Sequence, residues 1–138
     1  MEKFLDVYRN LNSNNLERLQ DIYTQNIRFV DPAHEIFGLE ALTRYFAKLY
    51  ENMDPPQFRF VHHLGSDFEG YVQWEMAFSH PRLANGGTIR VPGVSYLQFD
   101  ESGKTCFHRD YFDLGAMLYE QIPLLGRIVT YIKKRLGS

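Results

Sequence analysis

The spacing of apolar residues predicts three helices in the first part of the chain. The first is expected over residues 2–11. The second is expected to open at Asn14, because Asn14 and Glu17 form a variant of the capping box. The third should follow Gly38 and end at Pro55-Pro56. The apolar positions of these helices are Phe4, Tyr8 and Leu11, then Leu16, Leu19, Ile22 and Tyr23, and then Leu39, Leu42, Phe46, Leu49 and Met53.

The apolar period then changes from helical spacing to alternation, which predicts strands. A short strand around Ile27 and Phe29 is expected to stop at Asp31-Pro32. Proline cannot donate to a β-ladder, so Pro92-Gly93 should produce a bulge or sharp bend in a long strand. Helices followed by an antiparallel sheet predict an α+β domain. The long strands are expected at residues 57–65, 69–80, 87–99 and 104–113.

The last part of the chain combines an apolar stripe with positive charge. Pro123 suits the start of a helix, and no acidic residue follows Glu120. We expect the helix at residues 123–136 to cap the open end of the sheet or to pack on a second subunit. Contact with an anionic membrane surface is the less favoured alternative. The stripe is Leu124, Leu125, Ile128, Val129, Ile132 and Leu136, and the basic residues are Arg127, Lys133, Lys134 and Arg135.

Composition narrows the class of protein. A chain of 138 residues with 44% apolar and 15% aromatic residues is long enough for one domain with a real core and an apolar pocket. A net charge of −2 argues against general nucleic-acid binding. The single cysteine, Cys106, cannot form an intrachain disulfide, which favours a reducing compartment. With no signal-peptide pattern and no long apolar run, a cytoplasmic location is expected.

Neither a metal nor a cofactor is expected. The five histidines, of which His62 and His63 should face opposite ways, show no spacing typical of a metal site. The sequence also has no glycine-rich phosphate loop and no haem or flavin motif. Cys106 is expected to be a small buried core residue.

Two segments resemble the nuclear transport factor 2-like superfamily, and within it the SnoaL-like subgroup. They are residues 27–32 with 38–42, and Gly103-Lys104 leading into residues 108–113. The subgroup includes polyketide cyclases and relatives of ketosteroid isomerase and limonene epoxide hydrolase. The resemblance, over residues 3–115, implies a cone-shaped curved antiparallel sheet wrapped around the N-terminal helices. It also implies a pocket at the open end and a homodimer formed through the sheet. We therefore expect a domain at residues 1–115, which residues 116–138 extend with a C-terminal amphipathic helix.

Three polar residues are candidates for catalysis. The resemblance places Asp31 where isomerases of this superfamily carry a general base, although Asp-Pro also forms ordinary turns. By strand alternation His108 and Asp110 share the face that lines the pocket in the family, and they could form an acid–base pair. The alternative is that this pair only hydrogen-bonds its buried surroundings.

The residues limit which known activities are expected. The epoxide hydrolase triad would need polar partners where the chain has Trp74 and Met76. The isomerase's protonated acid is replaced by Ser95, and its tyrosine falls on Val7, with Tyr8 one step off the right face. Two classes stay open: acid–base isomerase, cyclase or hydrolase chemistry on a small, largely apolar molecule, or non-catalytic ligand binding or protein interaction. The ligand contacts that we expect are Phe29, His34, Phe46, Trp74, Met76, Phe78, Ser95, Leu97 and Phe112.

Overall fold

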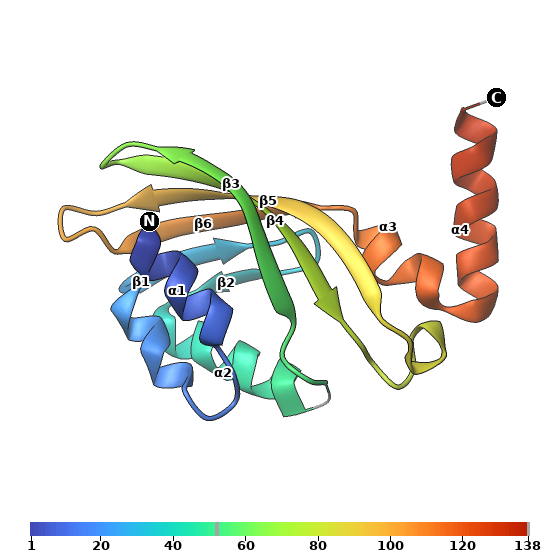
Figure 1. Ribbon diagram of the computed structural model, residues 1–138, viewed down its shortest axis with the longest axis horizontal. Coiled ribbons are helices and arrows are strands. Elements are labelled where there is room, and N and C mark those ends of the chain that lie inside the picture. The colour runs from blue at the N-terminus through green and yellow to red at the C-terminus, as the bar shows by residue number, and fades with distance from the viewer. Residues whose placement is uncertain (52, 138) are drawn as a thin grey trace.

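The computed structural model describes residues 1–51 and 53–137 as a curved sheet with helices on its concave side (Figure 1). The chain begins with helix α1 (Glu2–Asn10), the 3-10 helix η1 (Leu16–Asp21), strands β1 (Tyr23–Val30) and β2 (Glu35–Phe37), and helix α2 (Leu39–Glu51). Strands β3 (Gln57–Gly65), β4 (Glu69–Phe78), β5 (Ile89–Phe99) and β6 (Thr105–Phe112) follow, with the 3-10 helix η2 (Ala84–Gly86) before β5. The chain continues with α3 (Leu114–Met117), η3 (Tyr119–Gln121) and α4 (Pro123–Leu136). The expected α+β architecture is confirmed.

The six strands pair in the order β2-β1-β6-β5-β4-β3. Neighbouring strands run antiparallel except for β1 and β6, which are parallel. That parallel pairing sets Phe29 opposite His108. The first strand of the domain therefore lies beside the last, and both contribute residues to the same region of the concave face.

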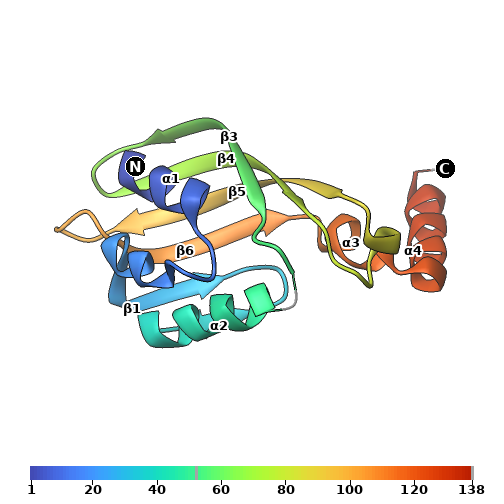
Figure 2. The same ribbon diagram turned by 60° about the horizontal axis from the view of Figure 1, so that its bottom comes forward.

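The core lies between the concave face of the sheet and helices α1 and α2 (Figure 2). Burying each large apolar side chain there contributes about 1.5–3 kcal/mol. The fully buried members come from every layer: Leu5 and Val7 of α1, Leu19 of η1, Ile27 of β1, Leu42 of α2, Val72 of β4, and Leu97 of β5. Helices and sheet thus share one continuous core.

The helix expected at Asn14 is shorter and tighter than predicted. Residues Leu16–Asp21 form a 3-10 helix, and its N-cap is Asn15, which makes no side-chain capping bond. The side chain of Asn15 instead accepts a hydrogen bond from the backbone N–H of Asn12. Tyr23 belongs to β1 because its backbone pairs with Thr105 of β6, so tertiary pairing overrides its helical spacing.

Of the bulge or sharp bend expected at Pro92-Gly93, the bulge is absent, since β4 and β5 keep one register through both residues. The β5–β6 pairing ends at Gly93, so Pro92 lies where the edge of β5 no longer needs an N–H donor. Gly93 has another role. It faces Trp74 across the β4–β5 ladder, and a Cβ atom there would overlap the indole ring.

Helix α4 stands apart from the sheet and does not cap its open end (Figures 1 and 2). Its only buried residue is Gly126. Of the two expected placements, capping of the open end is not seen, and packing on a second subunit stays a prediction. The helix meets the body through Gly126, Lys133 and Val129, and Val129 is the one stripe residue that is half-buried. Across the described residues, helices are too short or too polar to span a membrane.

Candidate functional site

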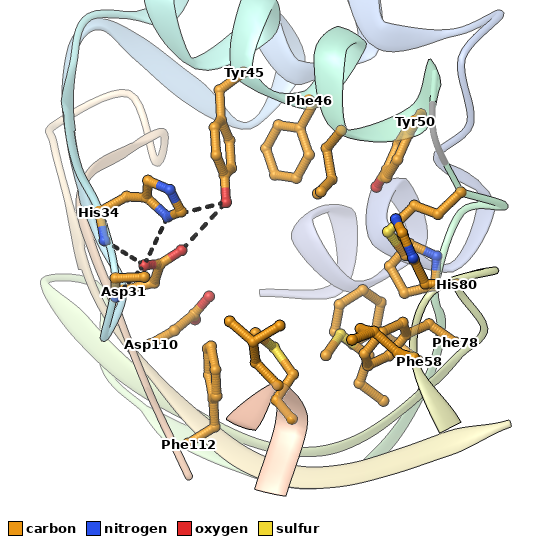
Figure 3. A pocket seen from close by; sticks show the side chains of 18 of the residues that line it. Asp31, His34, Tyr45, Phe46, Tyr50, Phe58, Phe78, His80, Asp110 and Phe112 are labelled. Carbon is orange, nitrogen blue, oxygen red and sulfur yellow. Dashed lines mark hydrogen bonds and ion pairs between the residues drawn. The ribbon is translucent and has the colours of Figure 1, made fainter. Parts of the chain in front are cut away.

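A cavity of about 590 Å³ opens between α2 and the concave face of the sheet (Figure 3). Pockets of this volume commonly hold small organic molecules. Most of its wall is apolar or aromatic, with Asp31, His34 and Asp110 at one side and His80 at the other. A ligand that fits this cavity is therefore largely apolar.

Seven of the nine side chains expected to contact a ligand lie at this wall, and whether they bind one stays a prediction. Ser95 and Leu97 do not lie there. Leu97 is fully buried in the core, and Ser95 lies behind the wall as a hydrogen-bond partner of the cavity-lining Trp74 and Asp110. The seven at the wall are Phe29, His34, Phe46, Trp74, Met76, Phe78 and Phe112.

Asp110 is a carboxylate at the cavity wall that is held from behind. Its Oδ1 accepts a hydrogen bond of 2.5 Å from the hydroxyl of Ser95. The same oxygen lies 2.6 Å from Nε2 of His108. Both bonds go to Oδ1, so the carboxylate is fixed in orientation and Oδ2 is the oxygen available to a ligand.

His108 does not itself reach the cavity, which corrects the expectation that it lines the wall. It is 2% exposed and packs against the rings of Phe4 and Phe29. His108 and Asp110 do share one face of β6, as strand alternation predicted. However, Asp110 lies one step nearer the open end, where the helices no longer cover the sheet. His108 therefore acts on the site through Asp110.

The hydrogen bonds continue in both directions from this pair. On one side, the indole N–H of Trp74 donates to Ser95 at 2.9 Å. On the other, Nδ1 of His108 lies 2.7 Å from the hydroxyl of Tyr23, which lies 2.5 Å from the hydroxyl of Tyr8. With a neutral imidazole protonated at Nε2, Tyr8 donates to Tyr23 and Tyr23 donates to His108. Burial raises the pKa of both phenols well above the ordinary 10.0, so both remain donors. Every donor in this series of hydrogen bonds therefore points toward Asp110.

Tyr8 corrects the expectation for the first helix. Tyr8 was expected one step off the helix face that points to the pocket. Its side chain instead lies inward, with its ring against Phe46 and Phe58 at the cavity wall. Its hydroxyl bonds Tyr23, and its position on the apolar stripe of the helix was the signal that could have revealed this.

Asp31 also lies at the wall, but it closes a turn. Its Oδ1 accepts hydrogen bonds from the backbone N–H groups of Ala33 at 2.8 Å and His34 at 2.7 Å. The imidazole Nδ1 of His34 lies 3.3 Å from the same oxygen. The structure therefore places Asp31 in the Asp-Pro turn and at the cavity at once, with Oδ1 already occupied.

Tyr45 of α2 lies beside Asp31 at the cavity wall, and sequence reasoning missed it. Its hydroxyl lies 3.4 Å from Oδ2 of Asp31 (Figure 3). Burial, followed by the negative charges of Asp31 and Asp110, raises the pKa of this phenol. Tyr45 is thus a neutral hydrogen-bond donor beside two acids. Its spacing of three from Leu42 and four from Leu49 was the signal available in the sequence.

The opposite side of the cavity contains residues that the sequence did not single out as ligand contacts. His80 and Arg82 follow β4, and His80 Nδ1 accepts a hydrogen bond from the backbone N–H of Arg82. Met117, Leu118 and Ile122 complete the wall from the C-terminal segment. Residues in loops and single helical turns carry no periodic pattern, so only the fold brings them to the site.

Other candidate chemistry finds no geometric support in the described part of the chain. Residues 1–51 and 53–137 contain no cluster of three or more His, Cys, Asp or Glu side chains that could hold a metal ion. Cys106 is half-buried rather than a core residue, because a register shift between β5 and β6 breaks the alternation there and Thr105 is buried instead. Its thiol donates to the carbonyl of Gln98.

Comparisons with known proteins agree with this architecture. Residues 4–108 match the sequence profile of the SnoaL-like domain, and no curated protein matches the sequence. A Jannaschia sp. protein assigned as a SnoaL-like polyketide cyclase is 16% identical, with 85% of this chain and 87% of that chain covered and a TM-score of 0.72. A Catenulispora acidiphila protein with a ketosteroid isomerase-like fold, in complex with trimethylamine, is 14% identical (86% and 87% covered, TM-score 0.70). A nuclear transport factor 2-like protein of unknown function from Burkholderia pseudomallei is 13% identical (86% and 93% covered, TM-score 0.74). At these identities the likeness shows the fold alone.

Proposed function

Since the chain belongs to the SnoaL-like domain family, whose profile matches residues 4–108, we propose that it binds a small, largely apolar carbonyl compound and removes a proton from it. The cavity sets the apolar character of the ligand. The single observation that carries the proposal is the carboxylate of Asp110, which is anchored through Oδ1 and lies at the wall of that cavity.

Asp110 is the general base in this proposal. Its Oδ2 takes a proton from the carbon next to the carbonyl group, the C–H bond breaks, and the electron pair moves onto the carbonyl oxygen as an enolate. Ser95 and His108 hold Oδ1, so the carboxylate does not need to reorient during the reaction. In an isomerase the proton returns to another carbon, whereas in a cyclase the carbanion attacks a second carbonyl.

Tyr45 supplies the complementary hydrogen bond. Its raised pKa keeps the phenol protonated, and its hydrogen bonds to Asp31 and His34 are long at 3.4 Å each. A ligand oxygen at this side of the cavity can replace them with a shorter bond. Donation to the oxygen stabilises the enolate more than the ketone, which is the preference that catalysis requires.

The alternative function is ligand binding without reaction. The observation that favours it is the turn at Asp31, where one oxygen is already satisfied by backbone N–H groups. In that case Asp110 and Tyr45 only orient the ligand.

The test uses 2-tetralone, an apolar cyclic ketone, in deuterium oxide. Mass spectrometry measures the exchange of its α-protons with wild type, Asp110→Asn and, as a matched control, Asp67→Asn, whose side chain is exposed in the β3–β4 turn. We expect wild type and Asp67→Asn to accelerate exchange. In Asp110→Asn the rate of exchange should fall at least about a hundredfold. The fluorescence of Trp74, the sole tryptophan, reports binding in each variant. Binding by wild type without exchange would support the alternative, and equal exchange by Asp110→Asn would refute the role of Asp110.

A further inference from the structure

Helix α4 presents its apolar side to solvent. Its 14 residues span about 21 Å. Leu124 is 73% exposed, Ile132 53% and Leu136 83%, and Ile128 and Tyr131 are exposed as well. An amphipathic helix with this much uncovered apolar surface requires a partner.

Helix α4 meets its own chain through Gly126, Lys133 and Val129, the half-buried edge of the apolar stripe beside Gly115. Lys133 forms ion pairs with Asp113 at 3.1 Å and Glu120 at 3.2 Å. Gly126 lies so close to the backbone of Glu120 that no side chain would fit between them. These contacts leave the rest of the apolar stripe exposed, and Figure 1 shows the helix standing apart from the sheet.

Charge indicates the chemistry of the missing partner. The segment after Glu120 carries four basic residues and no acidic ones, whereas the rest of the chain has eleven basic residues against seventeen acidic ones. Arg127 and Lys134 are seven positions apart, so they lie on the same side of the helix, beside the apolar stripe. This pattern is typical of helices that lie in the interface of an anionic bilayer. Pairing two α4 helices would instead bring like charges together with no acid on either helix.

We propose that α4 binds the protein to the surface of an anionic phospholipid bilayer. The apolar stripe enters the boundary between headgroups and acyl chains, while Arg127 and Lys134 reach the lipid phosphates. Met117, Leu118 and Ile122 line the cavity and directly precede α4. Docking therefore brings this edge of the cavity to the lipid, where apolar compounds concentrate.

The experiment measures binding of the full chain to vesicles by sedimentation. One set is pure phosphatidylcholine and the other contains about one third phosphatidylglycerol. We expect binding to the anionic set, loss of at least about tenfold in affinity for Arg127→Gln/Lys134→Gln, and loss of binding for Ile128→Ser/Ile132→Ser.

Matched variants control for charge and for exposed apolar surface. Lys3→Gln/Lys48→Gln removes two exposed cations from α1 and α2, and Leu64→Ser/Phe68→Ser removes two exposed apolar residues near the β3–β4 turn. Both should bind anionic vesicles as wild type does. Circular dichroism shows that each variant is folded. The proposal is overturned if wild type binds neither vesicle set, or if the control variants lose as much binding as the α4 variants. It is also overturned if light scattering shows that Ile128→Ser/Ile132→Ser only dissociates a dimer.

Discussion

His108 Nε2 lies 2.6 Å from Oδ1 of Asp110, although only the carboxylate of this pair reaches the cavity. The imidazole is buried beneath the helices, and its other nitrogen bonds Tyr23. The pair is therefore divided between the core and the site. Asp110 can contact a ligand, and His108 determines where that carboxylate points.

This division predicts different effects for two substitutions of His108. His108→Ala leaves the hydroxyl of Tyr23 and one hydrogen bond of Asp110 unsatisfied, so unfolding free energy should fall by about 1–3 kcal/mol. The rate of α-proton exchange should fall because the carboxylate is no longer fixed. His108→Gln can still donate to Asp110 and should recover part of both losses. Urea unfolding and the pH profile of exchange measure the two effects.

A purely structural role for His108 gives another outcome. Under that role, His108→Ala would lower stability while the exchange rate and its pH profile stay unchanged in the folded fraction. That result would remove His108 from the account of the site.

Asp31 and Asp110 should differ in their response to the same change. Asp31→Asn keeps an acceptor oxygen for the backbone N–H groups of Ala33 and His34, so fold and exchange should be largely retained. Asp31→Ala removes that acceptor, which should cost about 0.5–2 kcal/mol of stability, as the loss of a capping side chain does. Exchange assays and thermal unfolding decide between the two carboxylates. If Asp31→Asn abolishes exchange and Asp110→Asn does not, the general base is misassigned.

The buried phenols predict a loss of stability in alkali. Burial raises the folded pKa of Tyr8 and Tyr23 above the ordinary 10.0, so the unfolded chain ionises first as pH rises. The stabilisation that these protonated phenols give the folded state is complete below about pH 10. Above that pH the free energy of unfolding falls progressively, by up to about 1.4 kcal/mol per pH unit for each phenol. Urea unfolding between pH 8 and 11 measures the slope, which should be smaller in Tyr23→Phe. The exposed Tyr131→Phe is the matched control and should keep the wild-type slope.

Gly93 is predicted to admit no side chain. A methyl group there would overlap the ring of Trp74, so Gly93→Ala should cost about 1–3 kcal/mol and displace the indole from Ser95. The shift in tryptophan emission and the unfolding midpoint report these changes. Gly137→Ala introduces a methyl with only ordinary contacts and should be neutral. An unchanged emission spectrum in Gly93→Ala would show that Trp74 is not held by this contact.

Periodicity predicted much of the fold. Strands β3 and β4 and helix α2 each bury one face. The apolar residues of that face recur at a regular spacing, which can be read from the sequence. The 3-10 helix η1 and the early start of β1 could not be predicted, because pairing of Tyr23 with a strand far along the chain decides them. The parallel β1–β6 pairing has no local signal for the same reason.

The candidate site was predictable where side chains alternate. Trp74, Met76 and Phe112 follow from strand alternation, and the resemblance indicated Asp31 and Asp110. Burial along a strand is set by what covers it, so sequence could not show that His108 lies behind Asp110. The contributions of Arg82 and Leu118 come from loops whose positions only the assembled fold determines. The homodimer expected through the sheet stays a prediction.

A crystal structure with 2-tetralone bound tests the central claim most directly. We predict the ketone in the cavity, with its α-carbon within about 3–3.5 Å of Asp110 Oδ2 and its oxygen within hydrogen-bond reach of the Tyr45 hydroxyl. A ketone bound at the cavity wall away from Asp110, or an Asp110 carboxylate turned away from the ligand, would contradict proton abstraction by this residue.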